Sequence, residues 1–196
     1  IASELTLFLP VRLPYNWPQV RDFLQLRALT DIESVDSQSY RRAFNIDNEP
    51  GFVCATFDEQ QGGFQMKAQL TRPQHLQPLL NTLRRVLDMD TDPYSVGQAL
   101  SKAGLTPQQQ ATGLRLPGVW SVFEAGCRAI IGQQISIKAA ITQLQRLSNE
   151  LGEKQPYGHT FPTPQRVASS PLDMLKMPGA RKQAIRDFAA LVAANP

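Results

Sequence analysis

The spacing of apolar residues changes about half-way along the chain, and this change constrains the fold more than any other feature. In the first part, apolar and polar residues alternate, which predicts strands with one buried face. The clearest run is Leu5, Leu7, Leu9, Val11 and Leu13. After Pro93 the strand signals disappear, and apolar residues recur at the spacing of amphipathic helices. The sequence therefore predicts an α+β part followed by an all-α part, with the boundary near Asp88–Pro93.

Four more strand-like segments follow in the first part, separated by turn residues. They are Ile32–Val35, Ser39–Ile46, Phe52–Phe57 and Phe64–Leu70. A helix capped by Asn16 precedes these segments, and an amphipathic helix that begins at Pro73 follows them. The order strand, helix, four strands, helix fits an antiparallel sheet with helices on one face.

The second part predicts helices and loops only. Four long helices are expected over residues 94–103, 119–131, 136–152 and 179–194, with short helical turns at Pro164–Ser169 and Leu172–Lys176. The segment Gln155–Thr163 is rich in proline and glycine and is predicted to be a loop.

Composition excludes several classes of protein and of site. No apolar run approaches the ~20 residues that a membrane span needs, so no membrane partner is expected. Cys54 and Cys127 each lie in an apolar run, which favours buried free thiols over the alternative of one disulfide. The two histidines, His75 and His159, are close in sequence neither to each other nor to the cysteines, so no metal site is predicted.

Basic residues concentrate in the second part of the chain. Residues 1–95 hold nine Lys and Arg against twelve Asp and Glu, a net charge of −3, whereas residues 96–196 hold eleven against five, a net charge of +6. Basic side chains beside phosphates release counterions and give non-specific affinity for nucleic acid. The charge alone fits either a nucleic-acid-binding part or a helical domain that is merely basic.

Known catalytic templates are missing from the sequence. It has no phosphate-binding glycine-rich loop after a strand, no nucleophile elbow and no helix-borne pair of metal ligands. Glu124 is interpreted as a charge on an exposed helix face. Because no two carboxylates pair at a workable spacing, we expect no catalytic residue within this chain.

One polar turn between two predicted helices stands out. Gly132-Gln133-Gln134-Ile135 ends one apolar helix, and Ser136 is placed to cap the next. Glutamine amides both donate and accept hydrogen bonds, so they suit an edge that contacts bases or phosphates. An ordinary polar loop is the alternative.

The segment around this turn is similar to that of a known family. The run Gly113-Leu114-Arg115-Leu116-Pro117-Gly118, followed by Phe123-Glu124-Ala125-Gly126-Cys127-Arg128-Ala129-Ile130-Ile131-Gly132-Gln133-Gln134-Ile135-Ser136, resembles the corresponding segment of the bacterial 3-methyladenine DNA glycosylases II, which repair alkylated DNA. Further matches follow in order along the chain. They are Pro14-Tyr15-Asn16-Trp17, Ile32-Glu33-Ser34-Val35 and Phe161-Pro162-Thr163-Pro164-Gln165-Arg166.

The resemblance implies a two-domain DNA-repair enzyme. Residues 1–92 would form a TATA-binding-protein-like α+β domain, and residues 93–196 the N-terminal part of a helix-hairpin-helix glycosylase domain. Enzymes of this family bend double-stranded DNA, insert a side chain into the minor groove and rotate the alkylated base into an aromatic cleft. An aspartate then stabilises the positive charge on the sugar while the N-glycosidic bond breaks. The resemblance implies no cofactor, a monomer, and a place in the bacterial cytoplasm at the nucleoid.

The resemblance also assigns roles to individual residues. Gln134 matches the intercalating wedge, where relatives often have leucine. Gln133, Ile135 and Ser136 complete the DNA-contacting elbow. Phe23 matches an aromatic side chain that the first domain contributes to the base cleft, and the alternative for Phe23 is a place in the core of its own domain.

Several functional parts of the family are expected after Pro196. They are the hairpin signature, the catalytic aspartate and most aromatics of the cleft. Met177-Pro178-Gly179-Ala180 is not that hairpin, because Arg181 stands where a second glycine is needed. Since Ile1 is not an initiating methionine either, we expect a fragment of a longer DNA-3-methyladenine glycosylase, which alone does not excise bases.

Three alternatives remain open at this point. The glycosylase part is fused to an Ada-type alkylation-response regulator, which combines a methyltransferase with a transcription factor. Alternatively, the chain belongs to an oxidised-purine glycosylase, which needs a nucleophilic lysine in the hairpin. The third alternative is a non-catalytic module that binds DNA by its shape.

Overall fold

The structure is a computed structural model and describes residues 3–195. It contains two compact units. The first comprises the chain up to Leu26 together with Val35–Arg41 and Val53–Gly118, and the second comprises Arg27–Ser34, Arg42–Phe52 and the chain from Val119 onward. The predicted division into residues 1–92 and 93–196 stays a prediction.

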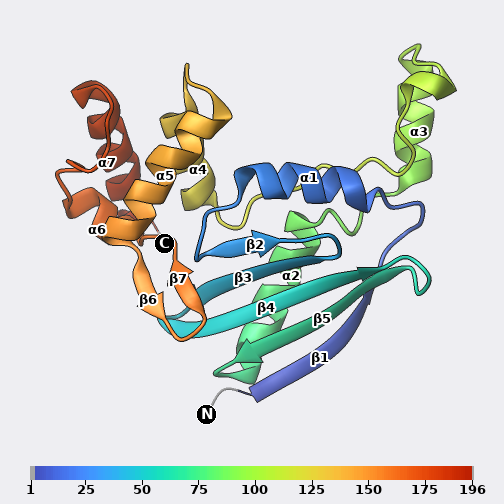
Figure 1. The fold of residues 1–196 in the computed structure, drawn as a ribbon, viewed down its shortest axis with the longest axis horizontal. Helices are drawn as coiled ribbons and strands as arrows, with labels where there is room; N and C mark the ends of the chain where they lie inside the picture. Colours follow the sequence, from blue (N-terminus) through green and yellow to red (C-terminus); the bar gives the residue numbers. More distant parts are fainter. Residues whose placement is uncertain (1–2, 196) are drawn as a thin grey trace. The chain divides into compact units, whose positions relative to one another are not determined.

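The alternating segments form one five-stranded sheet (Figure 1). Its strands are β1 (Ser3–Pro10), β2 (Glu33–Val35), β3 (Ser39–Ile46), β4 (Glu49–Asp58) and β5 (Gly63–Leu70), in the order β1-β5-β4-β3-β2. β1 and β5 pair antiparallel, so that Leu9 lies opposite Phe64. The α+β prediction for the first part of the chain is confirmed, and the strand boundaries differ from the predicted ones by a few residues at most.

In the described part of the first unit there are three α-helices and two short 3-10 helices, η1 (Pro73–His75) and η2 (Pro107–Gln109). The three α-helices frame the strands. They are α1 (Trp17–Arg27), α2 (Leu76–Val86) and α3 (Pro93–Lys102). Asn16 caps α1 as predicted, because its side-chain oxygen accepts a hydrogen bond from the backbone N–H of Gln19 at 3.1 Å. α2 buries Leu79, Leu83 and Val86 along one face, which is the stripe that its amphipathic sequence predicts.

An aromatic cluster fills part of the core of the first unit. Its members are Tyr15, Trp17, Phe57 and Phe64, whose contacting ring centroids are 5.2–6.0 Å apart. Separations of this size suit edge-to-face and offset contacts between rings. The cluster fixes the start of α1, since two of its members directly flank Asn16.

A buried arginine fastens the segment before α1. Arg115 is 1% exposed, and its guanidinium lies 4.8 Å from the ring centroid of Tyr15. It donates hydrogen bonds to the backbone oxygens of Arg12 and Pro14. Gly113 approaches the same loop so closely that an added Cβ would lie 2.8 Å from the carbonyl carbon of Pro14. The Gly113–Gly118 run therefore has a structural role in this unit.

Up to Asn195, the last residue described, the second unit holds four helices and a short hairpin. The helices are α4 (Val122–Gly132), α5 (Ile137–Leu151), α6 (Pro164–Ser169) and α7 (Gly179–Ala194). They surround an apolar core to which loops and the chain before β2 also contribute. Its buried members are Leu29, Ile32, Phe123, Cys127, Ile131, Ala140, Leu144, Leu147, Val167, Leu172, Leu175, Ile185 and Ala189.

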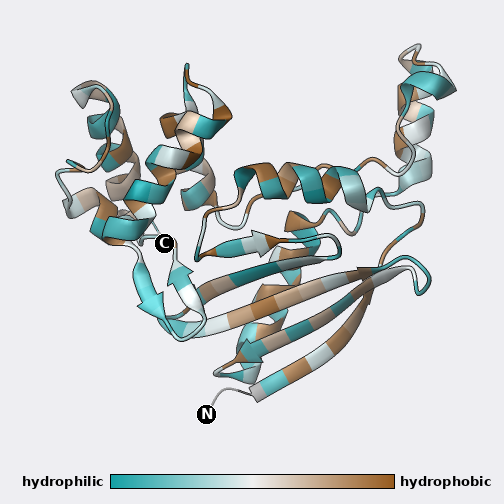
Figure 2. Cartoon of the chain, viewed as in Figure 1, coloured by the Kyte–Doolittle hydropathy of each residue, from teal (hydrophilic) through white to brown (hydrophobic). Residues whose placement is uncertain are grey.

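Two local predictions for the second part were wrong. Residues predicted as a loop form the hairpin of β6 (Glu153–Gln155) and β7 (Gly158–Thr160). Figure 2 shows these strands in teal to white, so they lack the apolar alternation that would have revealed them. The segment Leu172–Lys176 is a turn rather than a helical piece, and Leu172 has a φ of 58°.

Cysteine states and membrane propensity complete the description. Both cysteines are free thiols, with Cys127 buried as predicted and Cys54 only half-buried. Burial and, to a smaller extent, the nearby Glu124 carboxylate together raise the pKa of Cys127 to about 12. Within residues 3–195, no helix combines the length and apolar character needed to cross a bilayer.

Candidate nucleic-acid interface

The polar turn between α4 and α5 is an exposed elbow, defined as residues 133–138. α4 ends at Gly132, Gln133 is extended, and the backbone N–H of Ile135 reaches back to the carbonyl of Gly132 at 3.5 Å. Ser136 then caps α5, since its hydroxyl oxygen accepts a hydrogen bond from the N–H of Ala139 at 3.2 Å. The elbow is therefore a short connection held by regular structure on both sides.

The backbone of Gln134 is strained. Its φ is 59°, in the left-handed region that costs a residue with a Cβ about 1–2 kcal/mol. Glycine would adopt this conformation freely. Residues held in such sparsely populated backbone conformations cluster at functional sites.

The side chains of the elbow are presented to solvent. Every residue from Gln133 to Lys138 is exposed, including two isoleucines with exposed fractions of 38% and 42%. Neither glutamine side chain makes a hydrogen bond or ion pair within the part of the chain that the structure describes. The elbow thus offers free amides, apolar groups and one ammonium group to solvent.

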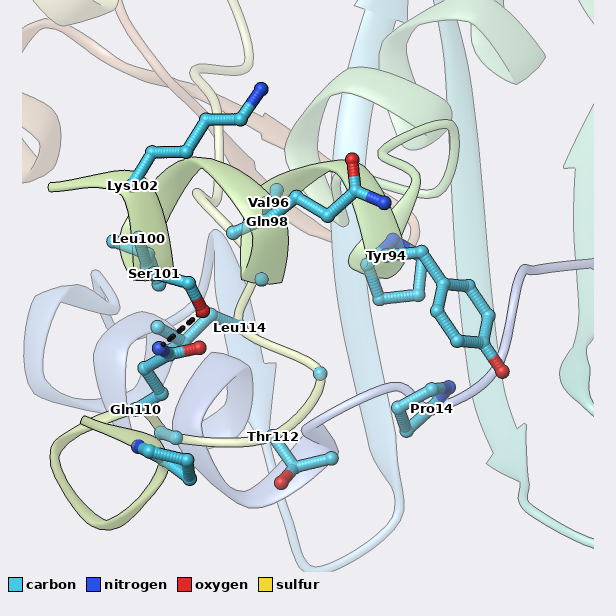
Figure 3. A pocket seen from close by; sticks show the side chains of 15 residues that line it. Pro14, Tyr94, Val96, Gln98, Leu100, Ser101, Lys102, Gln110, Thr112 and Leu114 are labelled. Atoms are coloured by element: carbon cyan, nitrogen blue, oxygen red, sulfur yellow. Dashed lines mark hydrogen bonds between the residues drawn. The ribbon is translucent and has the colours of Figure 1, made fainter. Parts of the chain in front are cut away.

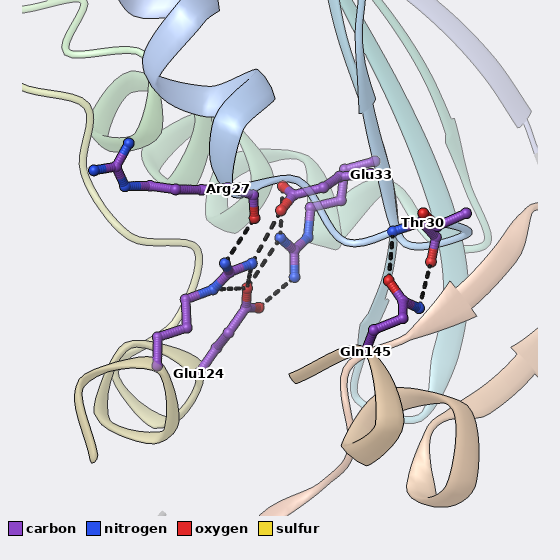
Figure 4. A network of polar contacts seen from close by, with 7 residues as sticks. Arg27, Thr30, Glu33, Glu124 and Gln145 are labelled. Atoms are coloured by element: carbon purple, nitrogen blue, oxygen red, sulfur yellow. Dashed lines mark hydrogen bonds and ion pairs between the residues drawn. The ribbon is translucent and has the colours of Figure 1, made fainter. Parts of the chain in front are cut away.

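A buried ion network anchors the start of α4, at the opposite end of the helix from the elbow (Figure 4). The carboxylate of Glu124 accepts hydrogen bonds from both terminal nitrogens of Arg42, and from Nε and Nη2 of Arg128 at 2.9 and 2.7 Å. Glu33 also pairs with both arginines, each at 3.0 Å. The network joins α4 to β2 and β3 inside the second unit.

Glu124 corrects a sequence-based expectation. It was expected on an exposed helix face, but it is 3% exposed. Burial alone would raise its pKa, yet the guanidinium groups of Arg42 and Arg128 outweigh burial and hold the pKa of this carboxyl below its usual range. A carboxylate kept charged between two arginines is a structural ion and not a proton donor.

Sequence reasoning missed Arg42, although a signal was present. Arg41 and Arg42 are neighbours in β3, and neighbouring residues in a strand point to opposite faces of the sheet. One of the two side chains is therefore expected to point to the buried face of the sheet and to need an acidic partner there. Arg42 does so, and its guanidinium also lies 4.6 Å from the ring centroid of Trp120.

Phe23 lies on α1 and is half-buried, whereas the fully buried positions of that helix are Trp17, Val20 and Leu24. It is therefore not at the centre of the α1 core stripe. Its assignment to a base cleft stays a prediction.

A separate pocket in the first unit carries none of the predicted site residues (Figure 3). It has a volume of about 630 Å³ and lies between α3 and the loop that contains Gln110. The side-chain amide of Gln110 donates a hydrogen bond to the hydroxyl oxygen of Ser101 at 3.1 Å. Most of its lining is apolar, with Tyr94 and Pro14 on one side. Among the described residues, no group of three or more His, Cys, Asp or Glu could hold a metal ion.

Comparison with solved structures shows the fold of the chain. A 3-methyladenine DNA-glycosylase from Archaeoglobus fulgidus matches 93% of this chain with a TM-score of 0.78 and 20% identity, over 66% of its own length. An 8-oxoguanine glycosylase/lyase from Clostridium acetobutylicum, solved with double-stranded DNA, matches 99% of the chain with a TM-score of 0.64 and 13% identity, over 65% of its own length. The chain has the α+β fold, with a TATA-binding-protein-like first part, that these DNA glycosylases share.

The family follows from the sequence itself. Residues 6–121 match the AlkA N-terminal domain, and the chain belongs to this family. It is 32% identical over 178 residues to DNA-3-methyladenine glycosylase 2 of Escherichia coli (strain K12), across 88% of this chain. It is 30% identical over 214 residues to the "Probable bifunctional transcriptional activator/DNA repair enzyme AlkA" of Mycobacterium tuberculosis, across 98% of this chain. The chain spans 62% of the length of the first relative and 40% of the second.

Proposed function

We propose that this chain supplies the DNA-distorting part of an alkylation-repair glycosylase. The complete gene product would hydrolyse the N-glycosidic bond of alkylated purines in double-stranded DNA, of the 3-methyladenine type. The observation that carries the proposal is the exposed, strained elbow of Gln133 and Gln134 in a chain of the AlkA N-terminal domain family. We further propose that it acts as a monomer, in the cytoplasm at the nucleoid.

The elbow residues have separate tasks in this proposal. Gln134 is the wedge that fills the gap in the base stack when a nucleotide is rotated out, which costs a few kcal/mol and is cheapest for damaged bases. Gln133, Ile135 and Ser136 lie against the DNA on either side of the wedge. Phe23 contributes one aromatic face to the cleft that receives the base, and a cationic alkylated purine stacks well on such a face.

The catalytic aspartate is proposed to lie outside these residues. The aspartates of the described helical part, Asp173 and Asp187, are both exposed to solvent. The buried acid Glu124 is held in the ion network. In the complete enzyme an aspartate would stabilise the sugar cation, and water would add to C1′ as the base departs. The residues of this chain would bind, bend and open the DNA.

Base release and DNA binding test the proposal together. The complete gene product should release 3-methyladenine from alkylated DNA, whereas the 196-residue chain alone should release none. Gln134→Ala should slow release and weaken binding to a duplex with an abasic analogue, while Gln60→Ala, at an exposed glutamine in the turn between β4 and β5, serves as the matched control. An unchanged release rate for Gln134→Ala would remove the wedge role, and release by the isolated chain would show that the acid is within it.

Two other functions remain as outcomes of this test. If the complete gene product binds the abasic duplex but releases no base, the chain is a module that recognises DNA shape. The name of the mycobacterial relative includes a transcriptional activator, so a fused Ada-type regulator is the other candidate. Transfer of a methyl group from alkylated DNA to the complete gene product would identify it.

A further inference from the structure

The free amide of Gln134 has a chemistry that an apolar wedge lacks. A leucine at this position fills a gap in the base stack and does nothing else. A glutamine brings one hydrogen-bond acceptor and two donors, and in this structure neither the acceptor nor the donors are used by any described residue. The question is which group on opened DNA matches this amide.

Rotating a purine out of the duplex leaves its partner unpaired. An extruded adenine leaves a thymine, and an extruded guanine leaves a cytosine. On the edge that had faced the purine, thymine presents an acceptor oxygen next to an N–H donor, and cytosine presents an amino donor next to an acceptor nitrogen. Both pyrimidines thus offer one donor beside one acceptor, in opposite orders.

A glutamine amide fits either order. Its oxygen and its amino group are side by side, and a half-turn about the last side-chain torsion exchanges them. The same side chain can therefore form two hydrogen bonds with thymine or with cytosine. A buried base edge left without partners would cost about 1–3 kcal/mol for each unsatisfied group, which an apolar wedge leaves uncompensated.

The other elbow residues fit this role less well. The Ser136 hydroxyl already caps α5 by accepting the N–H of Ala139, and it lacks the paired donor and acceptor groups of an amide. Lys138 has donors only, and Ile135 and Ile137 have no polar side-chain atom. Gln133 has the same amide, but its backbone is extended, and it precedes the left-handed residue at which the chain turns.

We propose, resting on the function proposed above, that the Gln134 amide replaces the lost partner of the pyrimidine opposite the extruded purine. Gln134 thereby accepts either estranged pyrimidine, and the protein tolerates alkylated adenine and alkylated guanine alike at this step. The exposed position of Gln134, its free amide and its strained turn carry the inference.

The experiment measures binding of the complete gene product to duplexes that hold a tetrahydrofuran abasic analogue. The base opposite the analogue is thymine, cytosine or difluorotoluene, which has the shape of thymine without its hydrogen-bonding groups. The wild type should bind the thymine and cytosine duplexes within about threefold of each other, and the difluorotoluene duplex roughly tenfold more weakly, as expected for two modest hydrogen bonds.

Variants at the two glutamines assign the effect. Gln134→Leu should keep a stack-filling side chain, and its ratio between thymine and difluorotoluene should fall to about one, because the hydrogen bonds are gone. Gln133→Leu, the matched control, should keep the wild-type ratio. Gln134→Glu, which keeps the shape of the side chain but has no donor, serves if the leucine variant does not fold, and its ratio should also fall.

The outcomes separate this inference from the proposed function. A wild type that binds the thymine and difluorotoluene duplexes equally, or a Gln134→Leu variant that keeps the wild-type ratio, overturns the role of the amide. A wild type that does not prefer the abasic duplex over an undamaged one overturns the proposed function itself.

Discussion

The buried ion network at the start of α4 yields the sharpest stability prediction, tested by Glu124→Gln. The side chains of Arg42, Glu33 and Glu124 are 3%, 8% and 4% exposed, and that of Arg128 is 23% exposed. The four formal charges sum to zero. Glutamine keeps the volume of the side chain but leaves one positive charge in excess, and its amino group faces guanidinium donors.

The expected loss of unfolding free energy in Glu124→Gln depends on the ion pairs that the two arginines keep with Glu33. Removing one partner of a buried ion pair costs about 3–5 kcal/mol. Both arginines keep Glu33 at 3.0 Å, so we expect a value near the lower end, roughly 3 kcal/mol of unfolding free energy. For a chain of this size that corresponds to a fall in Tm of roughly 6–12 °C. Asp22→Asn, in the exposed pair with Arg21, should cost less than about 0.5 kcal/mol and is the control.

The pH dependence supplies an independent check. The pKa of Glu124 is lowered in the folded state by Arg42 and Arg128, against the opposing effect of burial. Its contribution is therefore fully present above the unfolded glutamate pKa of about 4.3, and it is lost as the pH falls through the lower folded value. Urea unfolding should show a constant gap between wild type and Glu124→Gln from about pH 5 to 8, and a smaller gap below pH 4. A gap below about 1 kcal/mol at pH 7, or one that widens in acid, would refute the reasoning.

Three further measurements test other parts of the structure. Gly113→Ala should lower the unfolding free energy by about 2 kcal/mol or more, since φ is 70° and the new Cβ would lie 2.8 Å from the carbonyl group of Pro14. An unchanged urea midpoint would show that Gly113 and Pro14 are not in such close contact in solution. Iodoacetamide at pH 8 should label Cys54 well before Cys127, whose burial raises its pKa to about 12, and equal labelling rates in a mass spectrum would contradict the burial of Cys127. Gln134→Gly should leave the fold as stable or up to about 1 kcal/mol more stable while weakening binding to abasic DNA, and a clear loss of stability would mean that the left-handed turn is not strained.

Periodicity predicted most of the elements because burial of one face dictates it. The alternation of Leu5, Leu7 and Leu9 and the stripe of Leu79, Leu83 and Val86 both follow from packing one side of a strand or helix against a core. The β6–β7 hairpin escaped for the converse reason. Its strands are three residues long and polar. Its position depends on a backbone hydrogen bond from the His159 N–H to the Asp31 carbonyl, and a contact so distant in sequence cannot be predicted from a local pattern.

The exposure of the elbow was predictable from the sequence, but its backbone conformation was not. Two adjacent glutamines between two capped helices marked the elbow, and both are exposed. The left-handed backbone at Gln134 was not predictable, because glutamine has no preference for it and glycine would be the expected residue. The burial of Glu124 also depends on acids and bases distant in sequence, since Arg42 lies on β3 and Glu33 on β2.

The ion network and the elbow are at the two ends of one helix, and this gives the network a bearing on the elbow. α4 has 11 residues and is about 16 Å long, so one continuous helix connects the ion network to the elbow. The ion pairs hold the first turns of α4 against β2 and β3, and they thereby set the direction of its last turn. Ser136, four residues after that last turn ends, caps the start of α5. The proposed wedge would have to resist the base stack that it separates. Residues of α4 and of α5 both pack in the core of the second unit, so a movement of either helix would disturb that core. We therefore propose that the network helps to hold the Gln134 side chain in place on the exposed elbow.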